Sequence, residues 1–113
     1  MKQKLIELVE TCGFPVFLQG SLSPDAKYPD SFFTFWNFET PESMHYDNEA
    51  HSAVWGFWVF FYSVDPRLVE TETEKIRLLL KQNGFIVPGR GEDADSGRDT
   101  HTGRMLTAYF MEV

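Results

Sequence analysis

The stretch VWGFWVFFY, residues 54–62, decides how this chain folds. None of its residues is charged, and six of them are aromatic. Its length and its aromatic and β-branched content favour a strand over a helix. Side chains alternate between the two faces of a strand, and here both alternating sets are apolar. The sequence therefore predicts a strand whose two faces both need to be covered.

Composition limits what the protein binds. The chain has 113 residues, which predicts a single domain, 1–113, with a core of its own.

Its formal net charge of −7 and pI of about 4.8 disfavour binding to nucleic acid or to an anionic membrane. The aromatic strands could stack bases, but Lys and Arg do not alternate with the aromatics as such a platform requires. The stretch 54–62 is also far shorter than the ~20 residues of a membrane-spanning helix.

The remaining elements follow from periodicity and turn residues. Apolar residues at helical spacing predict a helix over residues 2–12 and another over 67–83. Asp65 is the expected N-cap of the second helix, with Ser63 as the alternative. Turn-forming residues fill 19–30, and the polar segment 40–50 connects two aromatic strands as a hairpin. We expect residues 88–103 to be a mobile polar loop. The expected strands are 16–18, 31–39, 51–63, 85–87 and 104–113.

This order predicts an α+β fold with a mostly antiparallel four-stranded sheet, two helices packed on one face, and long connecting loops. The helices can cover one face of the sheet and leave no element for the other. Either the loops 19–31 and 88–103 fold over that face, or another subunit covers it; we favour another subunit. The residues expected at this interface are Phe33, Phe35, Trp55, Phe57, Phe61, Tyr46, Asp47, Arg90, Arg98 and Arg104.

Sequence motifs for chemistry are weak, and we expect no catalytic, metal or cofactor residues. The acidic run Asp93–Asp99 lacks the ligand spacing of a calcium loop, since Gly97 replaces a ligand and no closing Glu follows. His45, His51 and His101 have no zinc-site spacing. Gly89-Arg90-Gly91 lacks the spacing of a phosphate-binding loop.

Nucleophilic and acid–base chemistry has no better support. Cys12 is the single cysteine, which excludes an internal disulfide, and it lies on the apolar side of the first expected helix. No nucleophile elbow or oxyanion loop accompanies it or any Ser. The loop acids Glu42, Asp47, Glu49 and Asp65 are typical of solvated loops. At the N-terminus, Glu7 and Glu10 interrupt any signal-peptide core, so we expect a protein made and kept in a cytoplasm.

Several segments together resemble the small tail-completion proteins of long-tailed bacteriophages and prophages, also described as head–tail joining or tail-terminator proteins. These segments are YPDSFFTFWNFETPES, HYDNEAHSAVWGFWVFFYSVDP, LLLKQNGF, and VPGRGEDADSGRDTHTGR before the last strand, together with the N-terminal helix. The resemblance covers most of the chain.

The resemblance implies an α+β fold and a ring homo-oligomer, commonly a hexamer, at the top of the tail tube. Its implied partners are tail-tube and head-connector proteins, with DNA passing through without specific binding. It implies no enzyme activity and no cofactor, and a location in the host cytoplasm during assembly and then in the virion. The competing interpretation is a small monomeric α+β domain with an apolar ligand cleft, as a binding module or an enzyme of unknown class.

Overall fold

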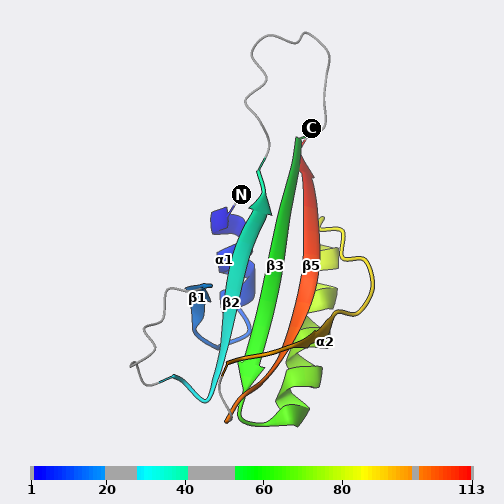
Figure 1. The fold of residues 1–113 in the computed structure, drawn as a ribbon. Helices are drawn as coiled ribbons and strands as arrows, with labels where there is room; N and C mark the ends of the chain where they lie inside the picture. The colour runs from blue at the N-terminus through cyan, green and yellow to red at the C-terminus, as the bar shows by residue number, and fades with distance from the viewer. Residues whose placement is uncertain (1, 20–27, 41–52, 98–99, 113) are drawn as a thin grey trace, which may run out of the picture.

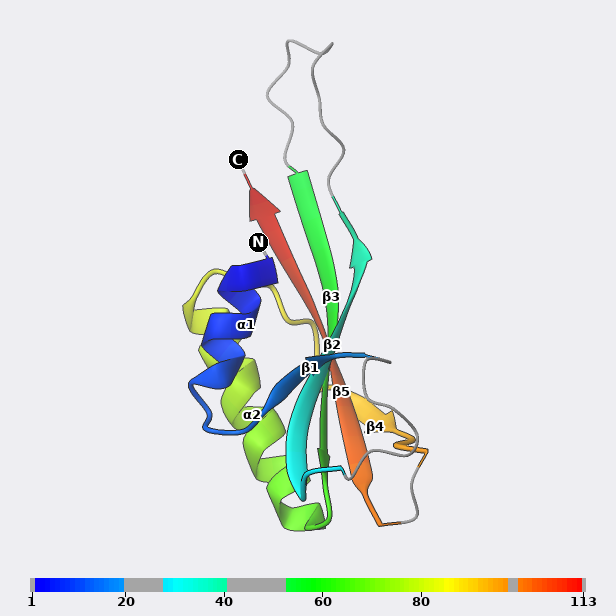
Figure 2. The ribbon, with the colours of Figure 1, turned by 90° about the vertical axis from the view of Figure 1, so that its left-hand side faces the viewer.

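The fold is known from a computed structural model that describes residues 2–19, 28–40, 53–97 and 100–112 (Figure 1). Two helices, α1 (Lys2–Glu10) and α2 (Pro66–Gln82), accompany a five-stranded sheet. Both helices lie on the same side of the sheet, as the side view in Figure 2 shows. The predicted α+β class, with two helices on one face, is therefore confirmed.

The sheet has one strand more than expected and is mixed. Its order is β1-β2-β3-β5-β4, in which β1 runs parallel to β2 and all other neighbours are antiparallel. The expected sheet was four-stranded and mostly antiparallel: its mostly antiparallel character agrees with the structure, and its number of strands does not. The strands are β1 (Val16–Leu18), β2 (Ser31–Glu39), β3 (Ala53–Ser63), β4 (Glu92–Ala94) and β5 (Thr102–Glu112).

The aromatic strands β2 and β3 form the predicted antiparallel hairpin. Phe33 lies opposite Phe61, and Trp36 lies opposite Trp58. The register shifts between Asn37 and Glu39. There the Asn37 amide donates to the carbonyls of Glu39 and Gly56 at 2.8 and 2.9 Å. This irregularity twists the exposed edge of β2 and discourages pairing with a foreign strand.

Local sequence accounts for the limits of α2. The Asp65 carboxylate accepts the backbone N–H of Arg67 at 3.0 Å, and Pro66 takes the first helical position. At the other end, Gly84 has a φ of 90° and lets the chain leave the helix. The predicted N-cap at Asp65 is thereby confirmed.

Residues 85–97 differ from expectation. In place of a strand over 85–87, Ile86 forms an isolated bridge with Tyr109 of β5. The strand β4 lies instead within the polar segment expected to be a loop. Gly91 makes its approach possible, because it has a φ of 91° and a Cβ there would collide with the carbonyl oxygen of Met105.

The hydrophobic core lies between the helices and the sheet face turned toward them, here called the inner face. The central aromatic side chains Phe33, Phe57 and Phe61 are no more than 1% exposed. They pack with the apolar stripes of both helices and with β5, and the buried partners include Leu5, Val9, Val69, Ile76, Leu80, Leu106 and Ala108.

Candidate functional site

The sheet face turned away from the helices, here called the outer face, is the surface toward the viewer in Figure 1. The cross-strand register places Trp36, Trp58 and Thr107 side by side on this face. The outer face divides into two parts along the direction of the strands. The distal end is where β2 and β5 end and β3 begins; the proximal part is the opposite half, next to β1 and β4.

The protein's own segments cover the proximal part. Phe32 is 3% exposed, because the rings of Tyr28 and His101 pack edge-on against it at centroid separations of 5.7 and 5.8 Å. A His101 ring nitrogen also lies 2.8 Å from the carbonyl oxygen of Pro29. Here the chain seals its own apolar face, which was one of the two alternatives left open by the sequence.

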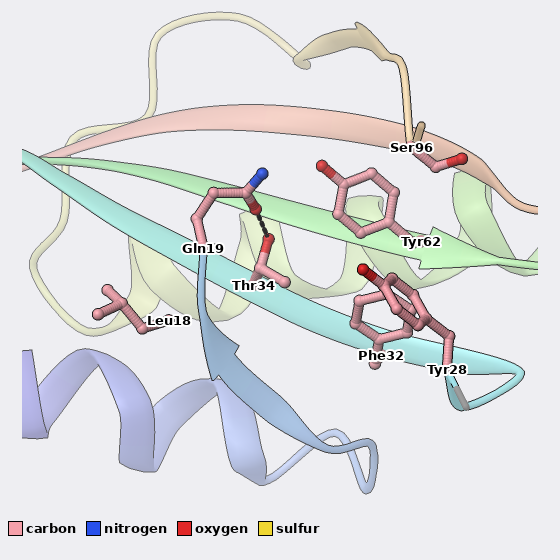
Figure 3. A pocket seen from close by; sticks show the side chains of 7 residues that line it. All are labelled: Leu18, Gln19, Tyr28, Phe32, Thr34, Tyr62 and Ser96. Atoms are coloured by element: carbon pink, nitrogen blue, oxygen red, sulfur yellow. Dashed lines mark hydrogen bonds between the residues drawn. The ribbon is translucent and has the colours of Figure 1, made fainter. Parts of the chain in front are cut away.

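A small hollow of about 120 Å³ remains in this proximal part (Figure 3). The Thr34 hydroxyl donates to the Gln19 side chain, and Tyr62 lies beside both. Burial raises the pKa of the Tyr62 phenol, although hydrogen bonds to Gln19 and Thr34 act in the opposite direction. The hollow is well below the ~300 Å³ of small ligand pockets, so it suits a few water molecules.

The distal end of the outer face is not covered by any described residue. Trp36 is 45% exposed, Trp58 36% and Met111 45%, while Phe38 and Tyr109 are partly buried. We call these five side chains the aromatic patch: Trp36, Phe38, Trp58, Tyr109 and Met111. Clusters of exposed apolar side chains often coincide with interaction surfaces.

The aromatic patch is internally ordered. Phe38 stacks on Trp58 with ring centroids 4.9 Å apart and meets Tyr109 edge-on at 5.8 Å. Gly56 lies beneath the Phe38 ring, because a Cβ at that position would be 2.6 Å from the ring. The absence of a side chain at Gly56 thus creates the space that Phe38 fills. Packed aromatic rings of this kind lose little side-chain entropy when a partner covers them.

Most of the aromatic residues expected at the interface lie on the inner face, which the helices cover. Phe33, Phe35, Phe57 and Phe61 are between 0 and 7% exposed on the inner face, and Trp55 is partly buried at the edge of the same core. The prediction is corrected for these residues, because the helices cover the alternating set to which they belong. The residues that remain accessible belong to the other set.

The polar members of the expected interface divide in two. Arg104 extends from β5 and donates to the Asp93 carboxylate at 2.8 Å and to the Gly91 carbonyl at 3.2 Å, which holds β4 in place. Arg90 is exposed at the same edge of the sheet. Tyr46, Asp47 and Arg98 lie outside the described residues, and their expected role stays a prediction.

Other candidate chemistry stays dispersed in the described part of the chain, where no three His, Cys, Asp or Glu side chains converge on a possible metal position. His45 and His51 fall outside this part. Cys12 is half-buried against the core, and burial together with the nearby Glu72 raises the pKa of its thiol. A raised pKa disfavours the thiolate that would act as a nucleophile.

Two larger hollows near α2 are lined by charged and polar residues together with apolar atoms. One of about 380 Å³ lies between the start of α2 and β4 and includes Glu70, Asp93 and Asp95. Another of about 300 Å³ is lined by Glu70, Thr73, Glu74, Arg90 and Arg104. Charged side chains line both hollows, whereas ligand pockets are lined predominantly by hydrophobic and aromatic residues.

Neither a protein-family model nor a curated protein matches this sequence. Within the described residues, the helices are too short or too polar to cross a bilayer. The aromatic patch is therefore the feature of this structure that points most directly to a function. Sequence reasoning recognised the doubled apolar character of β2 and β3 but assigned the exposed face to the wrong alternating set.

Proposed function

We propose that this protein is a structural assembly protein of a long-tailed bacteriophage or prophage. In this role it forms a ring at the head-proximal end of the tail tube, as a tail terminator or head–tail joining protein. The observation that carries the proposal is the aromatic patch, which leaves large apolar side chains exposed at one end of the sheet. The sequence resemblance supplies the particular assembly.

The patch supports a protein partner more than a small ligand. It lies on a strand surface, where Trp36 and Trp58 are cross-strand partners and both are exposed. Trp and Tyr are enriched among the residues that dominate binding energy at protein interfaces. A closed ring would cover such a surface in every subunit at once.

Charge supports the proposed location. The net charge of −7 makes non-specific adhesion to DNA unfavourable, which suits a passage through which DNA moves. The proposed partners are further copies of this chain, the tail tube and the head connector. The protein would act in the host cytoplasm during assembly and remain in the neck of the virion.

The proposal is tested first by genomic context and then by assembly. We expect the gene to lie among capsid, connector and tail-tube genes. We also expect purified protein, mixed with tail tubes of the same virus or prophage, to form rings at one tube end in electron microscopy. Light scattering should show an oligomer in the same samples.

A lone monomer at high concentration that also leaves tail tubes unbound would contradict the proposal. Lys and Arg side chains lining the lumen of an observed ring would contradict the role given to negative charge, while leaving the ring itself in place.

A further inference from the structure

Formal charge is distributed unevenly between the two helices and the rest of the sequence. The helices α1 and α2 contain six of the ten Lys and Arg residues but five of the 17 Asp and Glu residues. The rest of the chain is therefore strongly acidic. The two helices consequently have a formal net charge of +1, against −8 for the rest of the sequence, so a contact between the helices of one copy and an acidic surface of the next is less repulsive than a contact between two acidic surfaces.

The positive charge is concentrated where α1 begins and α2 ends. These two helix ends lie side by side in Figure 2. The Lys4 ammonium group lies 4.3 Å from the centre of the Phe110 ring and is thereby fixed in place. Lys2 and Lys81 are exposed, and no described residue forms an ion pair with either.

The same helix surface exposes an apolar side chain. Leu78 is 45% exposed on α2, one turn before Lys81. Residues three apart are neighbours on a helix surface, so Leu78 and Lys81 present an apolar and a cationic group together. We call Leu78 and Lys81 the basic helix surface.

The aromatic patch has the opposite character at its edge. The exposed Glu39 follows Phe38 directly at the end of β2, and the acids Asp30, Glu92, Asp93 and Asp95 are exposed elsewhere on the sheet and its loops. Arg90 is an exposed cation among these acids, and it lies near Met105 and Thr107 of β5. Two patches packed face to face would bring the Glu39 carboxylates of both copies into the same interface, which electrostatics disfavours.

The aromatic patch is smaller than a standard protein interface, so any contact that it makes must also include polar groups around it. At ~200 Å² for each large side chain, Trp36, Trp58 and Met111 together expose roughly 250 Å². A standard interface covers about 800 Å² on each partner. The aromatic patch can therefore supply an apolar centre, and charged groups around it must supply the remainder.

We infer that the aromatic patch of one copy binds the basic helix surface of the next copy, with Leu78 against the Trp36 and Trp58 rings and Lys81 near Glu39. This contact joins two different surfaces, so it repeats head to tail and can close a ring. The inference rests on the proposed function, which it deepens by naming the surface that covers the patch.

The test uses two variants that each lose one surface. Trp36→Glu/Trp58→Glu removes the aromatic patch, and Leu78→Glu/Lys81→Glu removes the basic helix surface. The matched control is Val64→Glu/Arg67→Glu, which changes an exposed aliphatic residue and a cation with the same spacing at the other end of α2. Sedimentation velocity and light scattering measure assembly, and circular dichroism measures folding.

We expect the wild type and the control to assemble and each surface variant to be monomeric. Mixed in equal amounts, the two surface variants should recover one contact and form a dimer that does not grow. That recovery also shows that both variants are folded.

Assembly by the Leu78→Glu/Lys81→Glu variant would overturn the inference and leave the ring proposal standing. Failure of two folded variants to pair would overturn it as well. A wild-type protein that stays monomeric at millimolar concentration would show that the copies do not bind one another, which would overturn the inference. Binding to tail-tube ends would then test the proposed function separately.

Discussion

Phe38 stacks on Trp58 at a centroid distance of 4.9 Å, although no residue of β3 is its direct cross-strand partner. The register shift between Asn37 and Glu39 and the missing side chain at Gly56 together allow this contact. The most exposed part of the sheet is thus held in a defined arrangement. An ordered, exposed aromatic cluster is the property that an assembly surface needs.

The space above Gly56 gives a first prediction. Gly56→Ala should displace the Phe38 ring and lower the free energy of unfolding by about 1–3 kcal/mol, as overpacking does. In a Phe38→Ala background the same change should cost little, because the ring that it meets is gone. Urea denaturation of the two single variants and the double variant measures this coupling. Additive costs would show that Phe38 does not occupy the space.

The two faces of the sheet should respond differently to truncation. Phe57→Ala removes a fully buried ring and should lower the free energy of unfolding by about 3–5 kcal/mol. Trp36→Ala, on the outer face, should cost less than about 1 kcal/mol in the monomer. Equal losses in denaturation at low protein concentration would mean that the monomer covers its outer face.

Tyr62 predicts a dependence of stability on alkaline pH. Burial raises the pKa of its phenol in the folded state, so the folded protein favours the neutral form. This contribution is complete below the ordinary pKa of about 10 and is lost as pH rises through the folded-state pKa. Difference absorbance between the wild type and Tyr62→Phe should show late ionisation of Tyr62. Ionisation at or below pH 10 would contradict the burial of the phenol.

Tryptophan fluorescence should report on the proposed assembly. Variants that retain a single Trp, at position 36, 55 or 58, and carry Phe at the other two positions keep the aromatic patch and separate the three signals. In the monomer, acrylamide should quench Trp36 and Trp58 more strongly than the partly buried Trp55. Assembly should lower the quenching of Trp36 and Trp58 several-fold and leave that of Trp55 nearly unchanged. Unaltered quenching of Trp58 in an assembled sample would exclude the aromatic patch from the contact.

The sequence by itself determined both helices and the long strands of this fold. Periodicity defined both helices, Asp65 and Pro66 marked the start of α2, and the aromatic alternation of residues 31–39 and 54–62 defined the central hairpin. These features depend on neighbours in the chain, which the sequence contains. It also indicated that β3 is apolar on both faces.

The tertiary structure decided which face is covered. Phe57 and Trp58 are adjacent aromatics that the sequence does not distinguish, yet one is fully buried and the other is 36% exposed. Which of the two side chains is buried depends on the side of the sheet on which α1 and α2 pack. That side is set by long-range connections of the chain. β4 was missed for the same reason, because Glu92–Ala94 is polar and becomes a strand through Arg104 and the close approach at Gly91.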